Sequence, residues 1–326
     1  AVALLITALT GNPGTVMFLG MTGVMWVSFI FVSAFQVYLF WQGIDLVRKF
    51  LNFAGPAVYV VMIILMIAIW AEVGGSLLSE VGNIFSSGTR SGGFEGLGSF
   101  GAFLAVFSIM VGYFAAVVIN FGDFARFVKN EEEMKKGNLY GLVGNVVFFS
   151  FITLMITGGT IALFGEYVAQ PTDMVAKVDN IFLTIVAAFA FFAATVGINM
   201  VANFIPPAYD LANLMPSKIN FRTGGLITAG FGFVIGGMWV AVITKMGIFP
   251  FVNTLGAILA PVFGIMITDY YIIKKQKIDV NALFNEGKGK YWYNDGFNLK
   301  GMVAWILSGY IAIGSVWPNI LPGGLG

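Results

Sequence analysis

Long apolar runs separated by short polar segments dominate the pattern of residues along the chain. A helix needs about 20 apolar residues to cross a bilayer, and the pattern predicts eight complete spans of that length. They lie near residues 24–44, 54–72, 101–124, 140–165, 180–205, 224–244, 249–273 and 300–319. The pattern therefore predicts an all-α polytopic membrane protein in which residues 1–326 form a single transmembrane domain.

The polar connections between these spans differ in their content of Lys and Arg. Fourteen of the 17 basic residues fall in alternate connections, and three fall in the others. Basic loops tend to stay in the cytoplasm, so we expect the chain to start outside, in a bacterial inner (plasma) membrane. The connections expected in the cytoplasm are 45–53, 125–139, 206–223 and 274–299.

The two ends of the sequence are abrupt. The chain begins AVALLITALTG, with no Met and no basic segment, and this start is typical of a helix already under way. It ends LPGGLG directly after the last span. We therefore expect a fragment that is truncated at both ends.

Composition supports the membrane assignment and excludes several kinds of chemistry. The chain is 58% hydrophobic and 10% charged, whereas a soluble domain is nearer a quarter charged. A net charge of +1 makes nucleic acid an unexpected partner. The absence of Cys and His excludes disulfides, thiolate chemistry and His-ligated metals. No catalytic grouping or nucleotide-binding loop is visible, so we expect neither an enzyme nor a bound cofactor.

The stretch 193–210, AATVGINMVANFIPPAYD, carries two carboxamides within a predicted span. Asn199 and Asn203 lie one helical turn apart on one face, and burying them in lipid is costly unless they are hydrogen-bonded. A double proline, Pro206-Pro207, is interpreted as the stop of this helix. The pair could be interhelical glue, but two carboxamides beside small residues favour a polar cavity.

Two other spans carry weaker signals. Gly112 lies about halfway along the third span and is followed by Tyr113 and Phe114. This arrangement fits simple helix packing, or a helix loosened at Gly112 so that its backbone reaches a ligand beside an aromatic face. In the first span, Gln36 and Gln42 are interpreted as interfacial, and Pro56 is placed in the first turn of the second span.

The candidate groups at membrane depth are all uncharged. Carboxamides supply paired donors and acceptors, and aromatic rings supply stacking. A carboxamide matches an amide or imide edge with one donor and one acceptor. The pattern therefore favours a small, flat, neutral substrate such as a nucleobase, a hydantoin or a ureide over a carboxylate or a cation.

Three long strings carry a resemblance to a known family. VGYFAAVVINFGDFARF in the third span, GINMVANFIPPAYD in the fifth and NTLGAILAPVFGIMITDYY in the seventh resemble the nucleobase–cation symport family of cytosine, uracil, allantoin and hydantoin permeases. The resemblance covers the whole chain. It implies a LeuT-type fold of two five-helix inverted repeats and two further helices. The eight spans would be the family's fourth to eleventh, with the first three helices and the last one missing.

The resemblance also implies roles for individual residues. Phe114 matches the aromatic that stacks on the substrate, and Gly112 lies at the break of that helix. Asn199 and Asn203 match two eighth-helix Asn residues, of which Asn203 is the stronger candidate for binding the substrate. The family's sodium-binding positions on this helix fall at Ala194, Gly197 and Ile198.

The sodium-binding members use a backbone carbonyl and two adjacent hydroxyl residues at these positions. The hydroxyls are missing here, and Thr195 lies on another side of the helix. The coupling ion, Na⁺ or H⁺, is therefore left open. The resemblance implies a secondary active transporter that imports a neutral nucleobase-like heterocycle or ureide by cation-coupled alternating access. Its expected partners are the substrate, the coupling cation and the bilayer. The alternative is a non-transporting membrane scaffold or channel in which the Asn pair is packing glue.

Overall fold

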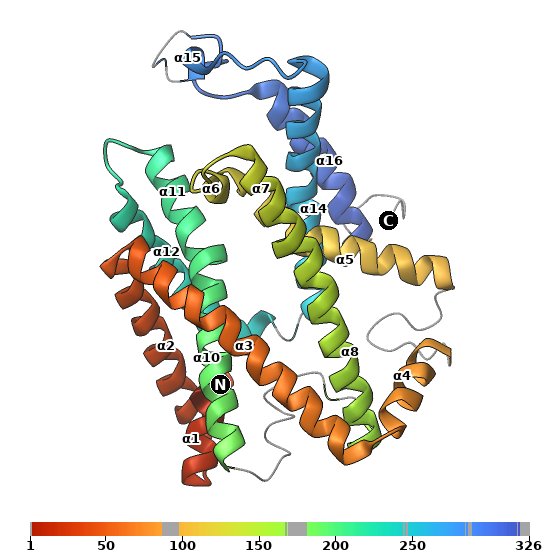
Figure 1. The fold of residues 1–326 in the computed structure, drawn as a ribbon. Helices are drawn as coiled ribbons and strands as arrows, with labels where there is room; N and C mark the ends of the chain where they lie inside the picture. Colours follow the sequence, from red (N-terminus) through yellow and green to blue (C-terminus); the bar gives the residue numbers. More distant parts are fainter. Residues whose placement is uncertain are drawn as a thin grey trace. The chain divides into compact units, whose positions relative to one another are not determined.

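The structure is a computed structural model that describes residues 2–86, 98–166, 168, 181–243, 245, 247–283, 285, 289–317 and 319. It consists of two compact units (Figure 1). The first unit comprises Ala1–Arg90 and Asp123–Ala241, and the second comprises Ser91–Gly122 and Val242–Gly326. Within the described residues, seven helices are long and apolar enough to cross a membrane.

The first unit contains most of the helices. Its α-helices are α1 (Val2–Thr10), α2 (Gly23–Gln42), α3 (Ile44–Val73), α4 (Ser76–Ser86), α7 (Glu131–Asn138), α8 (Asn145–Phe164), α10 (Ile181–Asn199), α11 (Ile205–Leu214) and α12 (Phe221–Gly237). π-Helical segments occur at η1 (Leu139–Gly144), η2 (Met200–Phe204) and η3 (Trp239–Ile243), of which η3 runs across the unit boundary. A short hairpin, β1 (Val16–Phe18) with β2 (Met21–Thr22), pairs antiparallel before α2. It is a small addition to the expected all-α fold.

Two large apolar clusters lie in this unit. Leu65 of α3, Leu77 of α4 and Ile152 of α8 are almost fully buried in one of them. The other cluster joins α2 to α10 and η2 through Phe40, Val196 and their neighbours. The first cluster fixes α3, α4 and α8, and the second positions the helices that carry the Asn pair.

Small residues set the packing of α12 in the same unit. A side chain at Gly225 would overlap the ring of Phe40 on α2. A Cβ at Gly224 would lie 2.6 Å from the carbonyl oxygen of Ala208 on α11. Close approach of backbones at small residues is the usual basis of helix association in lipid, and here it brings α12 against both α2 and α11.

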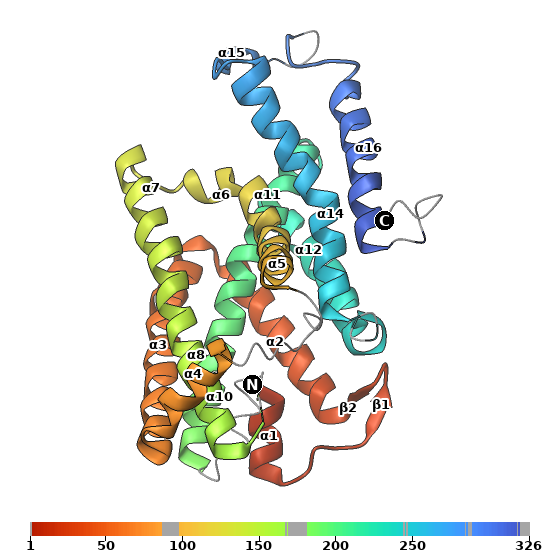
Figure 2. The same cartoon turned by 90° about the vertical axis from the view of Figure 1, so that its right-hand side faces the viewer.

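The second unit is built around α14 (Ile248–Ile267), which continues as a π-helical segment, η4 (Thr268–Ile273). It packs against α5 (Ser99–Ile119) and α16 (Leu299–Val316), and Figures 1 and 2 both show α14 and α16 side by side. The short α15 (Val280–Leu283) lies in the connection between them. Two tryptophans add hydrogen bonds to this packing. The indole N–H of Trp305 donates to Ile258 O, and that of Trp317 donates to Thr254 Oγ1, each over 2.8 Å.

The short helix α6 (Phe121–Ala125) includes the boundary in sequence between the two units, which falls after Gly122. Seven of the eight predicted spans coincide with the seven apolar helices. The span predicted at 224–244 corresponds to α12, which has 17 residues, followed by η3. The crossing at residues 224–244, and with it the total of eight, therefore stays a prediction.

The interpretation of the second span was wrong at its start. The helix α3 begins at Ile44, so residues 45–53 are helical, and Pro56 lies inside the helix instead of in its first turn. A proline removes one backbone N–H and its bond to the preceding turn. The remaining bonds and the packing of this 30-residue helix are sufficient to carry it through that position.

Candidate binding site

A cavity of about 820 Å³ lies within the first unit, bounded by α2, the α10–η2–α11 segment and α12. Aromatic and aliphatic side chains form most of its wall, including Phe29 and Phe233, whose rings stack with centroids 4.9 Å apart. Its polar side chains are Ser33, Gln36, Asn199, Asn203, Asp210 and Thr228. An apolar cavity with a few converging polar groups is the usual form of a small-molecule site.

Three carboxamides form a hydrogen-bonded chain along this wall. Asn199 Nδ2 donates to Gln36 Oε1 over 2.9 Å, and Asn203 Nδ2 donates to Asn199 Oδ1 over 2.7 Å. Gln36 is only 6% exposed, whereas Asn203 is exposed on the cavity side. We call these three hydrogen-bonded side chains the carboxamide chain. It begins at the buried Gln36 on α2 and ends at the accessible carboxamide of Asn203.

The direction of these hydrogen bonds determines which donor and acceptor groups of Asn203 stay available. A carboxamide has two N–H donors and one oxygen acceptor, and one N–H of Asn203 is used on Asn199. Among the described residues, Asn203 Oδ1 receives no hydrogen bond. One acceptor and one donor of the same planar group are therefore available to a molecule in the cavity.

The backbone at this point is a π-turn. The segment η2 spans Met200–Phe204 between α10 and α11, so Asn203 lies within it. The helix does not stop at Pro206-Pro207, as the sequence suggested; the prolines occupy the first turn of α11, and the helical path continues to Leu214. Proline is tolerated there because the N–H groups of a first turn have no helical partner. Single π-turns within helices are frequent at functional sites.

A charged cluster lies next to the cavity. Arg126 Nη2 forms an ion pair with Asp123 Oδ1 over 2.6 Å, and the Asp123 side chain is 9% exposed. The Arg126 guanidinium lies 4.3 Å from the ring centroid of Tyr209, whose neighbour Asp210 lines the cavity wall. Arg126 thus contacts α6 through the ion pair and α11 through the cation–π contact.

Gly112 and Phe114 belong to the second unit. The helix α5 is continuous from Ser99 to Ile119, so the expected break at Gly112 is wrong. Gly112 instead packs on α14: a Cβ at Gly256 would lie 2.8 Å from Gly112 Cα. This contact agrees with the packing interpretation of the glycine.

Gly112 also lines a second cavity, of about 510 Å³, together with Ser108, Asn253 and Ser315. Phe114 is not among the residues that line it. Its partly buried ring meets that of Tyr113 edge-on, with centroids 5.1 Å apart. The roles of Gly112 and Phe114 toward a substrate stay predictions.

The three positions matched to a sodium site lie on α10. Gly197 packs against α3, where an added Cβ would lie 3.1 Å from Leu51 Cδ2. Ala194 is partly buried and Ile198 is 65% exposed. The nearby hydroxyl of Thr195 donates to Phe191 O of its own helix over 2.8 Å. The neighbours of Gly197 are apolar, and a cation site at these three positions stays a prediction.

Gln36 is the residue that the sequence interpretation missed. It was considered interfacial, but it is buried and accepts the first bond of the carboxamide chain; Gln42 is exposed, as expected. The available signal was its spacing: Phe29, Ser33 and Gln36 follow one another at helical intervals, and all three line the cavity. A polar side chain on that shared face indicated a second wall for the Asn pair.

Comparison with known proteins gives the family. The family described as "permease for cytosine/purines, uracil, thiamine, allantoin" matches residues 1–321. The chain belongs to this family. The allantoin permease of Bacillus subtilis is 31% identical over 90% of the chain and 58% of its own length. A purine-uracil permease of Arabidopsis thaliana is 27% identical over 92% of the chain and 48% of its own length. The chain thus spans about half the length of these relatives.

A solved structure confirms the fold class. Mhp1 in an inward-facing conformation superposes with a TM-score of 0.66 and 24% identity, over 98% of this chain and 69% of that one. The chain therefore has the LeuT-type helical fold that the resemblance implied. With seven apolar helices within the part of the chain that the structure describes, this permease-family chain is an integral, multi-pass membrane protein.

Proposed function

We propose that the protein is a secondary active transporter that imports a neutral heterocycle or ureide of the cytosine, uracil, allantoin or hydantoin class. Uptake is driven by a cation gradient through alternating access. The observation that carries the proposal is the carboxamide chain ending at Asn203 in a largely apolar cavity. Family membership supports the same substrate class.

Recognition follows from the groups left free on Asn203. Its oxygen accepts from an N–H of the substrate and its remaining N–H donates to the adjacent carbonyl, so an amide or imide edge makes two bonds to one side chain. The rings of Phe29 and Phe233 supply apolar surface for a flat molecule. A carboxylate lacks the N–H of this edge, and a cation lacks the acceptor.

The coupling ion is proposed to be H⁺. The positions matched to a sodium site, Ala194, Gly197 and Ile198, carry no side-chain oxygen, and Na⁺ is a hard cation that requires oxygen ligands. Asp210 supplies an ionisable carboxylate on the cavity wall. Replacing Na⁺ by choline at constant pH should leave uptake unchanged, whereas collapsing the pH gradient should stop it.

The proposed topology places the chain start outside, in a bacterial inner membrane. The segments 45–53, 125–139, 206–223 and 274–299 then face the cytoplasm. The distribution of Lys and Arg supports this orientation. The sequence contains no Cys, so single-cysteine labelling can test this orientation. The side chain introduced by Lys135→Cys should not react with membrane-impermeant thiol reagents added to intact cells.

Radiolabelled uptake by the full-length protein in proteoliposomes tests the function. We expect saturable accumulation of at least one of cytosine, uracil, allantoin or a hydantoin, and its loss in Asn203→Ala. The rival is a scaffold or channel in which the Asn pair is packing glue. It would be supported if Asn203→Ala lowered thermal stability while uptake and ligand affinity of the folded fraction stayed unchanged.

A further inference from the structure

A third cavity, of about 630 Å³, lies between α14–η4 and α16 in the second unit. Its inner part is lined by small and apolar residues, including Pro261, Gly264, Ile265 and Ala304. Its outer part is polar and includes Asp269, Asn298 and Lys300. The cavity therefore has an apolar inner part and a polar mouth, and none of its lining residues belongs to the carboxamide chain.

The mouth lies where two apolar spans end on the same side. Pro250–Ile273 ends just before Lys274, and Leu299–Val316 begins just after Asn298. The connection between them contains Tyr291, Trp292 and Tyr293. Tyrosine and tryptophan gather at membrane–water interfaces, so this mouth is placed at the level of lipid headgroups.

The charges at the mouth leave one cation unpaired. Lys274 Nζ is bonded to Asp269 Oδ2 over 2.5 Å and lies 4.8 Å from the ring centroid of Tyr291. The bond to Asp269 raises the pKa of Lys274 above its ordinary value, so this ammonium stays charged. Among the described residues, Lys300 makes no ion pair. Lys274 does not line the cavity, but its ion pair offsets the charge of Asp269 in the lining, so Lys300 supplies the remaining positive charge at the mouth.

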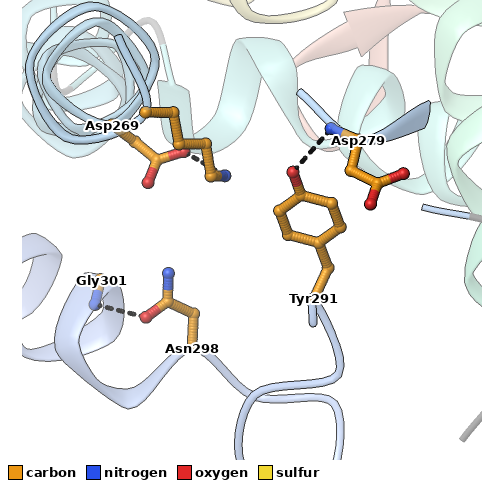
Figure 3. Close-up of polar contacts among 6 residues, drawn as sticks. Asp269, Asp279, Tyr291, Asn298 and Gly301 are labelled. Carbon is orange, nitrogen blue, oxygen red and sulfur yellow. Dashed lines mark hydrogen bonds and ion pairs between the residues drawn. The ribbon is translucent and has the colours of Figure 1, made fainter. Parts of the chain in front are cut away.

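Asn298 adds oriented donors to this charge. Its Oδ1 accepts from the Gly301 backbone N–H over 3.1 Å, and this bond fixes the side chain at the start of α16. Figure 3 shows the amide nitrogen of Asn298 on the opposite side, pointing into the open space between Asp269 and Tyr291. An ammonium and an amide N–H₂ at one mouth are suited to phosphate oxygens.

The length of the apolar part of the cavity favours a phospholipid over a free phosphate. The lining runs from Asp269 to Pro261 along α14, which is about 12 Å at 1.5 Å per residue. A Cβ at Gly264 would meet no atom within 4 Å, so this part of the groove is open. A free phosphate would occupy the mouth and leave the apolar part unfilled, whereas a lipid acyl chain would fill it.

We propose that this cavity binds an anionic glycerophospholipid, with its phosphate at Lys300 and Asn298 and an acyl chain along the groove beside Gly264. Lysines near a membrane surface attract anionic lipids, and basic pockets between helices are suited to their headgroups. The site is independent of the proposed transport function.

Lipid binding by the full-length protein in detergent tests this proposal. Phosphatidylglycerol and phosphatidylcholine with identical acyl chains would be titrated, with bound lipid counted by native mass spectrometry and thermal stabilisation measured in parallel. We expect phosphatidylglycerol to bind about fivefold more tightly. Lys300→Gln should remove this preference, and Lys277→Gln, an exposed lysine outside the cavity, should keep it.

A second pair of variants tests the groove. Gly264→Leu should fill it and weaken both lipids, because the added side chain has room. Gly55→Leu, at an exposed position on α3 where an added Cβ would also meet no atom within 4 Å, lies outside the lining and is the matched control. Equal affinity for the two lipids, an unchanged preference in Lys300→Gln, or equal binding by the two leucine variants would overturn the proposal. Stabilisation by water-soluble glycerol phosphate as large as that by the lipid would also overturn it.

Discussion

Asn199 Nδ2 lies 2.9 Å from Gln36 Oε1, and this bond joins α10 to α2 across one wall of the cavity. It also decides the orientation of both Asn side chains. With its N–H₂ group directed at Gln36, Asn199 presents its oxygen to Asn203, and Asn203 in turn directs one N–H back along the chain. The free acceptor of Asn203 is therefore set by a glutamine two side chains away.

Gln36→Leu should weaken substrate binding although Gln36 lies at the end of the carboxamide chain that is farthest from Asn203. Loss of the acceptor leaves Asn199 free to turn, and one net hydrogen bond is worth about 1 kcal/mol, or roughly fivefold in affinity. Equilibrium binding to the purified full-length protein measures the effect. Gln42→Leu, at the exposed end of the same helix, should bind as the wild type does. Identical affinities for both variants would contradict a positioning role for Gln36.

Asn203→Asp should bind substrate weakly at neutral pH and recover as the pH falls. A carboxylate would place an acceptor against Asn199 Oδ1, where the wild type has a donor 2.7 Å away. A protonated carboxyl can donate this bond again, so binding should recover as the pH falls. Affinity measured between pH 5 and 8 checks this, and Asn203→Ala, which cannot regain a donor, should show no recovery.

Asp210→Asn should separate binding from coupling. The substitution keeps the size of a side chain on the cavity wall but removes its ionisable group. We expect substrate affinity within about twofold of the wild type, because the carboxamide chain is untouched, together with loss of accumulation driven by a pH gradient. Counterflow exchange, which needs no gradient, should persist. If accumulation against a gradient survives in this variant, the proton is not carried at Asp210.

Gly225→Ala should lower stability because its Cβ would overlap the ring of Phe40. Overpacking of this kind costs about 1–3 kcal/mol. Thermal unfolding in detergent measures the change. Gly230→Ala on the same helix, where the space is open, is the control. Adding Phe40→Leu should restore part of the loss, and an absence of any rescue would show that the contact with Phe40 is not its cause.

The two glycines at the α5–α14 crossing should respond unequally. A Cβ at Gly256 lies 2.8 Å from Gly112 Cα, whereas a Cβ at Gly112 has its nearest atom, Val252 O, at 3.4 Å. Gly256→Ala should therefore destabilise the protein more than Gly112→Ala. If Gly112→Ala instead abolished substrate binding with unchanged stability, the glycine would serve the ligand and not the packing.

The fold was largely predictable because membrane crossing imposes a strong and simple pattern. Every backbone polar group in lipid must be bonded within the helix, so apolar length alone located seven of the helices that the structure contains. The prolines were misjudged for a physical reason. Pro56 and Pro206-Pro207 each disturb only one turn, and sequence rules cannot tell whether packing will carry the helix past that turn.

The site was half predictable. Asn199 and Asn203 were recognisable because they share a helical face, a relationship that lies within one segment of sequence. Gln36 is 163 residues from Asn199, and no local pattern encodes such a contact. The helix break expected at Gly112 was wrong. The residues allowed packing and a loosened helix equally, and Gly256 on α14 provides the packing.

The π-turn at Met200–Phe204 has a consequence for the two halves of its helix. A π-turn contains one residue more than an α-turn, and each residue of an α-helix advances about 100° around the axis. Deleting a single residue from this turn would relax it to regular α-helix and rotate α11 by about that angle relative to α10. Asp210 and Leu211 would then leave the cavity wall while Asn199 kept its bond to Gln36. One inserted residue thus allows the carboxamides and the carboxylate of a single helix to share one cavity.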